Sequence, residues 1–324
     1  MGIPGFIELN EKTQEISFRH HRKGDEVLIT RLFEEVFGDT MTVEQWRWKY
    51  EGQGFLNQKS FVATNEDGRI IGHFGGIPLR MWFKDKVIVG YQGADVMVDE
   101  KYRGLPNRRG LYSNICRLFY ENLPSFVYGF SNLDHLRLGM LLGFFEKAIE
   151  VNDITIYTTK HVIPLYNLEM MDWEDSKIDT LWNEVYRSLG WSIVRNTAFL
   201  KWRYEHNPFR YYRLYGLRRR FIKGILGWVV MREVNDDEFW LMDMIFKDEH
   251  LEYLLKTIIS MAYKQGKKKI VLWLSSRYHD RLRSMGGEFF RRGTYITNCI
   301  WVKMCESDEM REKFYYTMGD TDFL

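Results

Sequence analysis

One stretch of the sequence constrains the fold more than any other: an apolar strand that leads through a glycine- and arginine-rich loop into a helix. Residues 94–98 are apolar apart from Asp95 and predict a strand, and apolar residues recur at helical spacing over 111–119. Such a unit favours an α/β fold. It is also a common phosphate site, because the free N–H groups of the first helical turn and the positive end of the helix dipole face the same anion.

The loop supplies the residue types that an anion site needs. Arg103, Arg108 and Arg109 bring positive charge, and Gly104 and Gly110 let the backbone approach a ligand closely or adopt a positive φ. This pattern predicts a cradle for pyrophosphate. A basic surface loop on an ordinary strand-to-helix crossover explains the same residues, so spacing alone leaves both interpretations open.

Residues 98–104, VDEKYRG, and 109–113, RGLYS, resemble motif A of the GNAT superfamily of acyl-CoA N-acyltransferases, V-x-P-x-x-R-G-x-G-x-G/A. In that family the backbone amides of the motif bind the pyrophosphate of coenzyme A. The chain departs from the motif at 99–100, where proline is common, in an insert at 105–108, and at Tyr112, where a small residue is usual. The resemblance implies acetyl-CoA or another acyl-CoA as co-substrate, bound through this stretch: Met97, Val98, Arg103, Gly104, Arg108, Arg109, Gly110, Leu111, Tyr112 and Ser113.

A second stretch, residues 132–144, resembles the closing motif of the same family, N-x-x-A-x-x-L-Y-x-x-x-G-F. The tyrosine that often acts there as general acid is Gly139 in this chain. The resemblance implies that Asn132 contacts the cofactor where two strands splay apart. The alternative for Asn132 is a plain helix N-cap.

The order of predicted elements over the first half, β-α-α-β-β-β-α-β-α-β, is the order of that fold. The predicted strands are 16–18, 61–64, 69–74, 78–83 with 87–89, 94–98, 126–130 and 151–158, and the predicted helices are 25–36, 43–50, 111–119 and 131–142. Residues 164–176 have the character of a linker.

The second half repeats the first. Residues 48–51, WKYE, recur as 202–205, WRYE, and Asp95 recurs as Asp243, at a spacing of about 145 to 155 residues. After Ile245 the second copy has no R-G-x-G element and carries two acids, which would repel coenzyme A. The sequence therefore predicts two tandem GNAT-like domains of the α/β class, each a mixed, mostly antiparallel sheet flanked by helices. The domains are 1–163, which binds acyl-CoA, and 164–324, which is degenerate and shapes the acceptor pocket.

Bulk properties exclude several classes of protein. The net charge of +2 over 324 residues gives no general reason to expect a nucleic-acid or membrane partner. Cys116, Cys299 and Cys305 show neither disulfide nor zinc spacing, and no metal is expected. The start of the chain lacks the pattern of a signal peptide, and no apolar run approaches the roughly 20 residues of a membrane span. We expect a cytoplasmic monomer or homodimer.

Candidate catalytic residues lie on the strands before the cradle and at the end of the chain. Asp95 is a candidate for deprotonating the amine, as acids on this strand do in the family, and His73 has the side chain of a general base. A structural carboxylate and a core histidine are the alternatives. In the aromatic, acidic tail, Asp320, Asp322 and the terminal carboxylate of Leu324 are candidates for holding the amine, and fraying is the alternative.

The predicted function is transfer of an acyl group from acyl-CoA to a primary amine of a small molecule, possibly an amino sugar. The resemblance implies direct attack of the amine on the thioester, with a backbone N–H near Met97 or Val98 meeting the oxyanion. Two alternatives stay open. One is aminoacyl transfer from a charged tRNA to a cell-wall precursor, and the other is a non-catalytic ligand-binding protein with this fold.

Overall fold

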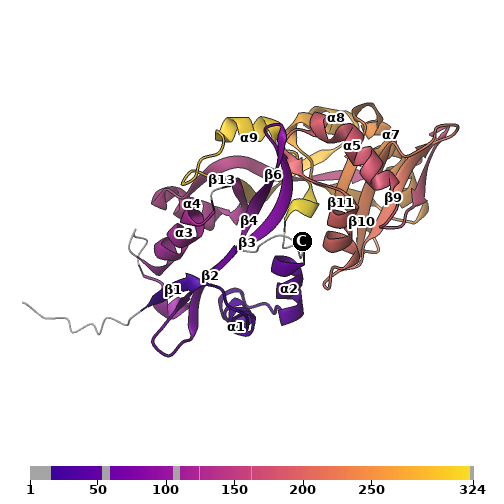
Figure 1. The fold of residues 1–324 in the computed structure, drawn as a ribbon. Helices are drawn as coiled ribbons and strands as arrows, with labels where there is room; N and C mark the ends of the chain where they lie inside the picture. The colour runs from indigo at the N-terminus through magenta and orange to yellow at the C-terminus, as the bar shows by residue number, and fades with distance from the viewer. Residues whose placement is uncertain (1–15, 53–58, 105–109, 124, 162, 322–324) are drawn as a thin grey trace, which may run out of the picture.

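A continuous, twisted sheet runs through the whole molecule (Figure 1). The computed structural model describes residues 16–52, 59–104, 110–123, 125–161 and 163–321. Within these ranges, neighbouring strands follow the order β1-β2-β3-β4-β5-β13-β6-β12-β11-β10-β9-β7, and β8 pairs with β3 off this path. No helix of the described part is long and apolar enough to cross a membrane.

The first half of the chain alternates between strands and helices in the predicted order. Its elements are β1 (Ser17–His20), α1 (Glu26–Phe37), α2 (Val43–Glu51), β2 (Lys59–Thr64), β3 (Ile70–Phe83), β4 (Lys86–Val98), α3 (Leu111–Glu121), β5 (Val127–Asn132), α4 (Leu133–Leu142) and β6 (Phe145–Tyr157). The amphipathic pattern of α3 is confirmed, because Leu111, Ile115 and Phe119 are buried in the core beneath the helix.

The second half follows a similar order, with the additional short strand β8 between its first two helices and the additional helix α9 after its last strand. Its elements are β7 (Tyr166–Met170), α5 (Lys177–Leu189), β8 (Ser192–Ile193), α6 (Thr197–Leu200) with the π turn η2 (Lys201–Glu205), β9 (Arg213–Arg219), β10 (Gly227–Asn235), β11 (Glu238–Phe246), α7 (Leu251–Lys264), β12 (Lys269–Leu272), α8 (His279–Ser284), β13 (Glu288–Cys299), α9 (Ser307–Lys313) and the 3-10 turn η5 (Met318–Asp320).

The two halves exchange strands. β13, from the end of the chain, lies between β5 and β6 of the first half and pairs antiparallel with both. β6 in turn pairs antiparallel with β12 of the second half. In the sheet, the strands that complete the first half therefore follow the order β4-β5-β13-β6. Those that complete the second half follow the order β11-β12-β6-β13. The sheet of each half thus contains a strand from the other half. The predicted division at 163/164 did not include this exchange of strands.

Two sequence predictions need correction. The strand predicted to break after residue 74 is continuous as β3, and it turns into β4 through Lys84 and Asp85, which both adopt a positive φ. Pro78 lies within β3 opposite Tyr91 of β4, two residues beyond Gly76, where the described pairing with β2 begins. The stretch 164–176, predicted as a linker, contains β7, which pairs with β9 at the edge of the sheet.

Candidate functional site

The strands β4 and β5 separate at one point and leave an opening in the sheet. They pair in parallel only where Tyr91, Gln92 and Gly93 face residues 127–129. Beyond Gly93, β4 continues alongside β3, whereas β5 continues alongside β13. The facing edges of β4 and β5 are therefore parted over residues 94–98 and 130–132.

A cavity of about 490 Å³ occupies this opening. Its lining comes from α1, β4, α3, β5, α4 and β13 and includes Phe33, Phe37, Asp95, Val96, Tyr112, Ser131, Asn132, His135, Thr294, Thr297 and Cys299. A second cavity of about 310 Å³ lies at the start of α3 and is lined by Arg103, Gly104, Gly110, Leu111 and Ser113, among others. Val96 and Tyr112 line both cavities. The two cavities are therefore neighbours, one at the helix start and the other in the split sheet.

The start of α3 has the geometry of an anion site. Gly110 is its N-cap, with φ −68° and ψ 163°, and no side chain caps the first turn among the described residues. The N–H groups at the start of a helix favour an anion, and the second cavity lies at this helix start. Arg108 and Arg109 lie outside the described residues. Arg103 is exposed, and its Nε donates to the Val98 carbonyl at 2.9 Å, so this arginine holds the end of β4.

The backbone of β4 presents alternate amides to the opening. The Asp99 N–H donates to the Ile71 carbonyl on β3 at 2.9 Å, and Met97 lies opposite His73. In an antiparallel pair the N–H groups of successive residues point to opposite edges. The Met97 amide is therefore directed to β3, and the Val98 amide is directed to the parted edge. Of the two predicted donors, Val98 is the one whose amide faces the opening.

Asp95 lies in a bulge of β4 beside the cavity. Its φ is +50°, and Asp95 and Val96 together face a single residue of β3. Both carboxylate oxygens lie 2.8 Å from Lys49 Nζ, and the Tyr50 hydroxyl donates to Oδ2 at 2.7 Å. Burial opposes ionisation of this carboxyl, but the ammonium and hydroxyl of its partners outweigh burial and lower the pKa of Asp95. The carboxylate is therefore ionised at neutral pH.

His73 lies beneath this bulge and is fully buried. Its Nδ1 is 2.8 Å from the Asp95 carbonyl oxygen, so this nitrogen carries the proton and donates. Its Nε2 is 2.7 Å from Ser60 Oγ and accepts. Burial lowers the pKa of His73 to about 4, and the ring is neutral. Both ring nitrogens are occupied within the core, and the role of general base stays an untested prediction.

Asn132 serves as a helix N-cap and also lines the larger cavity. Its Oδ1 accepts from the His135 N–H at 2.9 Å and begins α4. The two interpretations of Asn132 are therefore compatible. In the same region, the Tyr112 hydroxyl lies 2.8 Å from His135 Nε2, and Ser131 Oγ lies 3.1 Å from His135 Nδ1.

Sequence reasoning did not assign His135, Ser131 or the β13 residues to the site. His135 recurs in the second copy as His279, and this recurrence taken alone favours a structural role. No sequence signal places β13 beside β5, since that pairing joins Thr297 to Gly129, which are 168 residues apart in the sequence.

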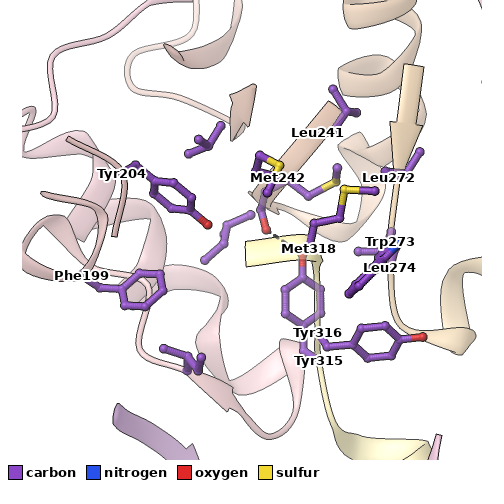
Figure 2. Close-up of a cluster of buried hydrophobic side chains, with 14 of the residues drawn as sticks. Phe199, Tyr204, Leu241, Met242, Leu272, Trp273, Leu274, Tyr315, Tyr316 and Met318 are labelled. Atoms are coloured by element: carbon purple, nitrogen blue, oxygen red, sulfur yellow. Dashed lines mark hydrogen bonds between the residues drawn. The ribbon is translucent and has the colours of Figure 1, made fainter. Parts of the chain in front are cut away.

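The second copy has a comparable opening, and the tail of the chain fills it (Figure 2). β11 and β12 pair in parallel only over residues 238–241 and 269–272. Tyr315 follows α9, and its hydroxyl donates to the Met244 carbonyl at 2.6 Å. On the other side, Ser275 Oγ donates to the Phe314 carbonyl and accepts from the Tyr316 N–H. The tail thus occupies, in the second half, the kind of opening that is a cavity in the first.

The end of the tail is fixed by a buried ionic cluster. Arg195 donates to Asp243 at 2.8 Å and to Asp320 at 2.5 Å, and all three side chains have no exposed surface. Asp320 also accepts from the Thr317 N–H. Of the two alternatives for the tail, packing against the protein and fraying, the structure shows packing for this part. The Asp320 carboxylate, however, pairs with the buried Arg195. Asp322 and Leu324 lie outside the described residues.

Comparison with known proteins identifies the fold. Residues 17–131 match the family model of the acetyltransferase (GNAT) domain. The first half carries a GNAT domain. The predicted resemblance is therefore confirmed. A sequence search of curated proteins found no match.

Solved structures extend this similarity over both halves. A conserved protein of unknown function from Enterococcus faecalis V583, described as a probable N-acyltransferase, has a TM-score of 0.69 at 14% identity over 91% of this chain and 74% of that chain. A GCN5-related N-acetyltransferase from Anabaena variabilis ATCC 29413 has a TM-score of 0.64 at 15% identity over 90% and 74%. A tandem GNAT protein from the clavulanic acid biosynthesis pathway has a TM-score of 0.57 at 10% identity over 88% and 98%. At these identities the likeness shows the fold, and the fold is that of tandem GNAT proteins.

Proposed function

We propose that this protein transfers an acyl group from acyl-CoA to a primary amine of a small molecule. One observation carries the proposal: the cavity between β4 and β5 and the cavity at the start of α3 lie next to each other and share Val96 and Tyr112 in their walls. A long, thin ligand with an anionic end fits this arrangement, because the helix start binds phosphate and the parted strand edges bind an amide chain. Acetyl-CoA has this form.

In the proposed mechanism the chain positions both reactants. The thioester lies in the larger cavity beside Asp95, and the Val98 N–H is available to the cofactor along the parted edge of β4. Asp95 is ionised, so it accepts a hydrogen bond from the amine and orients it for attack. Its low pKa makes the carboxylate a weak base, and the amine proton leaves to solvent. His73 contributes by holding the Asp95 carbonyl, and therefore the bulge.

We also propose that the two halves have different roles. Residues 1–163 supply the cofactor cradle, with β13 completing the cavity from the second half. Residues 164–324 support it and border the acceptor side. An amino sugar is one acceptor that suits a cavity with a carboxylate and hydroxyl groups in its wall.

A non-catalytic acyl-CoA-binding protein is the second candidate function, and one observation favours it. A Cβ atom at Gly139, the position of the family's acid, would lie 1.9 Å from the Phe145 ring. No tyrosine fits there without displacement of Phe145. A functioning acyltransferase therefore needs its proton donor elsewhere.

Calorimetric titration with acetyl-CoA and with free coenzyme A tests the cofactor assignment. The informative variants are Gly110→Asp and Gly110→Asn, because both residues are good N-caps at the observed backbone angles and leave α3 intact. Gly110→Asp places a negative charge where the pyrophosphate would lie. We expect it to weaken binding by about 100-fold or more, whereas Gly110→Asn should stay within about tenfold of the wild type.

The outcome separates the candidate functions. If the wild type and Gly110→Asp bound acetyl-CoA equally well, the pyrophosphate site could not lie at the start of α3. Binding that follows this prediction, together with release of free thiol when hydroxylamine is supplied as a simple amine, favours the acyltransferase. Binding without any thiol release favours the non-catalytic candidate.

A further inference from the structure

The tyrosine position of the closing motif is blocked in this protein by packing. Phe145 begins β6 and is buried, and three of its ring atoms lie 1.9 to 2.4 Å from the Cβ that any residue other than glycine would place at 139. Helix α4 therefore cannot present a side chain toward the cofactor from position 139. Only a different element could supply a proton to the departing thiolate.

A hydrogen-bonded chain of three side chains meets at the larger cavity. Tyr112 comes from the first turn of α3, His135 from the first turn of α4, and Ser131 from β5. The Tyr112 hydroxyl lies 2.8 Å from His135 Nε2, and Ser131 Oγ lies 3.1 Å from His135 Nδ1. All three residues line the cavity, and Tyr112 also lines the cavity at the helix start.

We propose that Tyr112, held by His135, donates the proton to the coenzyme A sulfur as the carbon–sulfur bond breaks, an inference that rests on the proposed acyl transfer. The amine nitrogen forms a bond to the carbonyl carbon, and the electron pair of the carbon–sulfur bond goes to sulfur. The Tyr112 hydroxyl proton then moves to that sulfur. The proton that the amine loses restores the phenol through solvent, so no further reactant is needed.

The protonation states support this role. Burial raises the pKa of Tyr112 well above its ordinary value, so the phenol holds its proton at neutral pH. Burial lowers the pKa of His135 to about 4, so the imidazole is neutral. A neutral ring with its proton on Nε2 donates to the phenol oxygen, so this bond does not use the phenol hydrogen. The same N–H then stabilises the phenolate after transfer.

The other ionisable groups near the phenol leave this arrangement intact. Cys116 lies one turn further along α3 and has a side-chain hydrogen bond with Tyr112. Burial raises the pKa of its thiol, so the thiol is neutral and can donate to the phenol oxygen. Asp95 lines the same cavity but is bound to Lys49, and Arg103 lines the cavity at the helix start.

The second copy lacks this arrangement, and its opening is filled. Helix α7 begins at Leu251, as α3 begins at Leu111, so Glu252 stands in the place of Tyr112. Glu252 accepts from Arg281 at 2.6 Å, and His279 Nε2 is 2.9 Å from the Leu274 carbonyl. The histidine recurs, but its tyrosine partner does not. The Tyr112–His135 pair therefore occurs in the copy with an open cavity, which favours a role in chemistry over a role in folding.

The first test measures the ionisation of the thiol of bound coenzyme A, through the ultraviolet absorbance of the thiolate, and needs no acceptor. A hydrogen bond from Tyr112 stabilises the thiolate. In Tyr112→Phe we expect the thiol pKa of bound coenzyme A to rise by about one unit, the size of one hydrogen bond to a charged group. His135→Asn should give a smaller rise. Tyr316→Phe, which removes a buried phenol hydroxyl in the second half, is the matched control and should leave the thiol pKa unchanged.

The second test measures acyl transfer from acetyl-CoA to hydroxylamine by release of free thiol. For Tyr112→Phe we expect acetyl-CoA affinity within about threefold of the wild type and turnover lower by about 100-fold, the usual scale of general acid catalysis.

The results discriminate between the two proposals. Wild-type turnover and an unshifted thiol pKa in Tyr112→Phe would overturn this inference and leave the acyltransferase function standing. Loss of acetyl-CoA binding in Tyr112→Phe would make Tyr112 a binding contact and would also overturn it. Failure of the wild-type protein to bind acetyl-CoA would overturn the proposed function itself.

Discussion

Trp48 and Trp202 bind each other in a reciprocal manner. The indole N–H of Trp48 donates to the Trp202 carbonyl at 2.7 Å, and the indole N–H of Trp202 donates to the Trp48 carbonyl at 2.8 Å. The rings stack with centroids 5.7 Å apart. The two residues are 154 positions apart and occupy the same place in the two copies. The copies are therefore related by an approximate two-fold axis that passes between these side chains, and the exchange of β6 and β13 follows the same symmetry.

Replacement of one tryptophan should show what this contact contributes. Trp202→Phe keeps an aromatic ring but leaves the buried Trp48 carbonyl without the indole donor, and we expect a loss of about 1–3 kcal/mol in the free energy of unfolding. Urea unfolding measures the loss. Trp301→Phe, at a position that is 41% exposed, is the control and should change stability by less than about 0.5 kcal/mol. Equal stability of Trp202→Phe and the wild type would show that the reciprocal bonds contribute nothing.

The sequence predicted what is local and repeated. The WKYE and WRYE segments indicated a second copy, and in both copies the tyrosine of this segment donates to the recurring aspartate, Tyr50 to Asp95 and Tyr204 to Asp243. The helices and the order of the first half also followed from periodicity. These features are encoded in a few neighbouring residues, so one sequence suffices to find them.

Long-range features could not be predicted. The insertion of β13 between β5 and β6 depends on which edges are free once both halves have folded, and no local pattern encodes that choice. The tail was recognised as able to pack back, but its place between β11 and β12 was not foreseen. Recurrence of His135 as His279 gives no information about its partner, because the partner Tyr112 does not recur in the second copy.

The strand exchange makes the cofactor cavity composite, and this can be tested on β13. Thr297 lies 4% exposed in the cavity wall, with its hydroxyl donating to the Gly129 carbonyl at 3.3 Å. Thr297→Trp should fill the point where β4 and β5 part. We expect acetyl-CoA binding to weaken by at least about tenfold, with an overpacking cost of about 1–3 kcal/mol.

Calorimetry and urea unfolding measure the two effects in the same samples. Phe290→Trp, on the exposed part of the same strand, is the control and should leave acetyl-CoA affinity unchanged. If Thr297→Trp bound acetyl-CoA as the wild type does, the cofactor would have to lie outside this cavity.

The contact between Gly139 and Phe145 predicts a stability effect that can be relieved. Gly139→Ala forces a methyl group against the Phe145 ring, and we expect a loss of about 1–3 kcal/mol in the free energy of unfolding. Adding Phe145→Leu should recover part of the lost stability, because the smaller side chain leaves room for the methyl group at position 139. Met140→Ala, at the neighbouring exposed position, controls for changes in α4 itself. Urea unfolding of the wild type, the two single variants, the double variant and Met140→Ala measures these effects. An additive loss in the double variant would contradict the clash.

The buried ionic cluster predicts a pH dependence of stability. Burial raises the pKa of Asp320 to about 6 from an ordinary value of 3.8, although Arg195 opposes the rise. Between these two pH values the folded state binds the proton more tightly than the unfolded state does. The stabilising contribution of this group is therefore fully present below pH 3.8 and is lost as the pH rises through about 6.

Asp320→Asn removes this titration. Two pKa units correspond to roughly 3 kcal/mol, so the stability of the wild type relative to the variant should fall by up to that amount from pH 4 to pH 7. Urea unfolding at four pH values across this interval measures the difference. Asp280→Asn, whose parent side chain is 97% exposed, should give a difference that is nearly constant with pH. A wild-type advantage that grew with rising pH would show that Asp320 is ionised throughout, with Arg195 outweighing its burial.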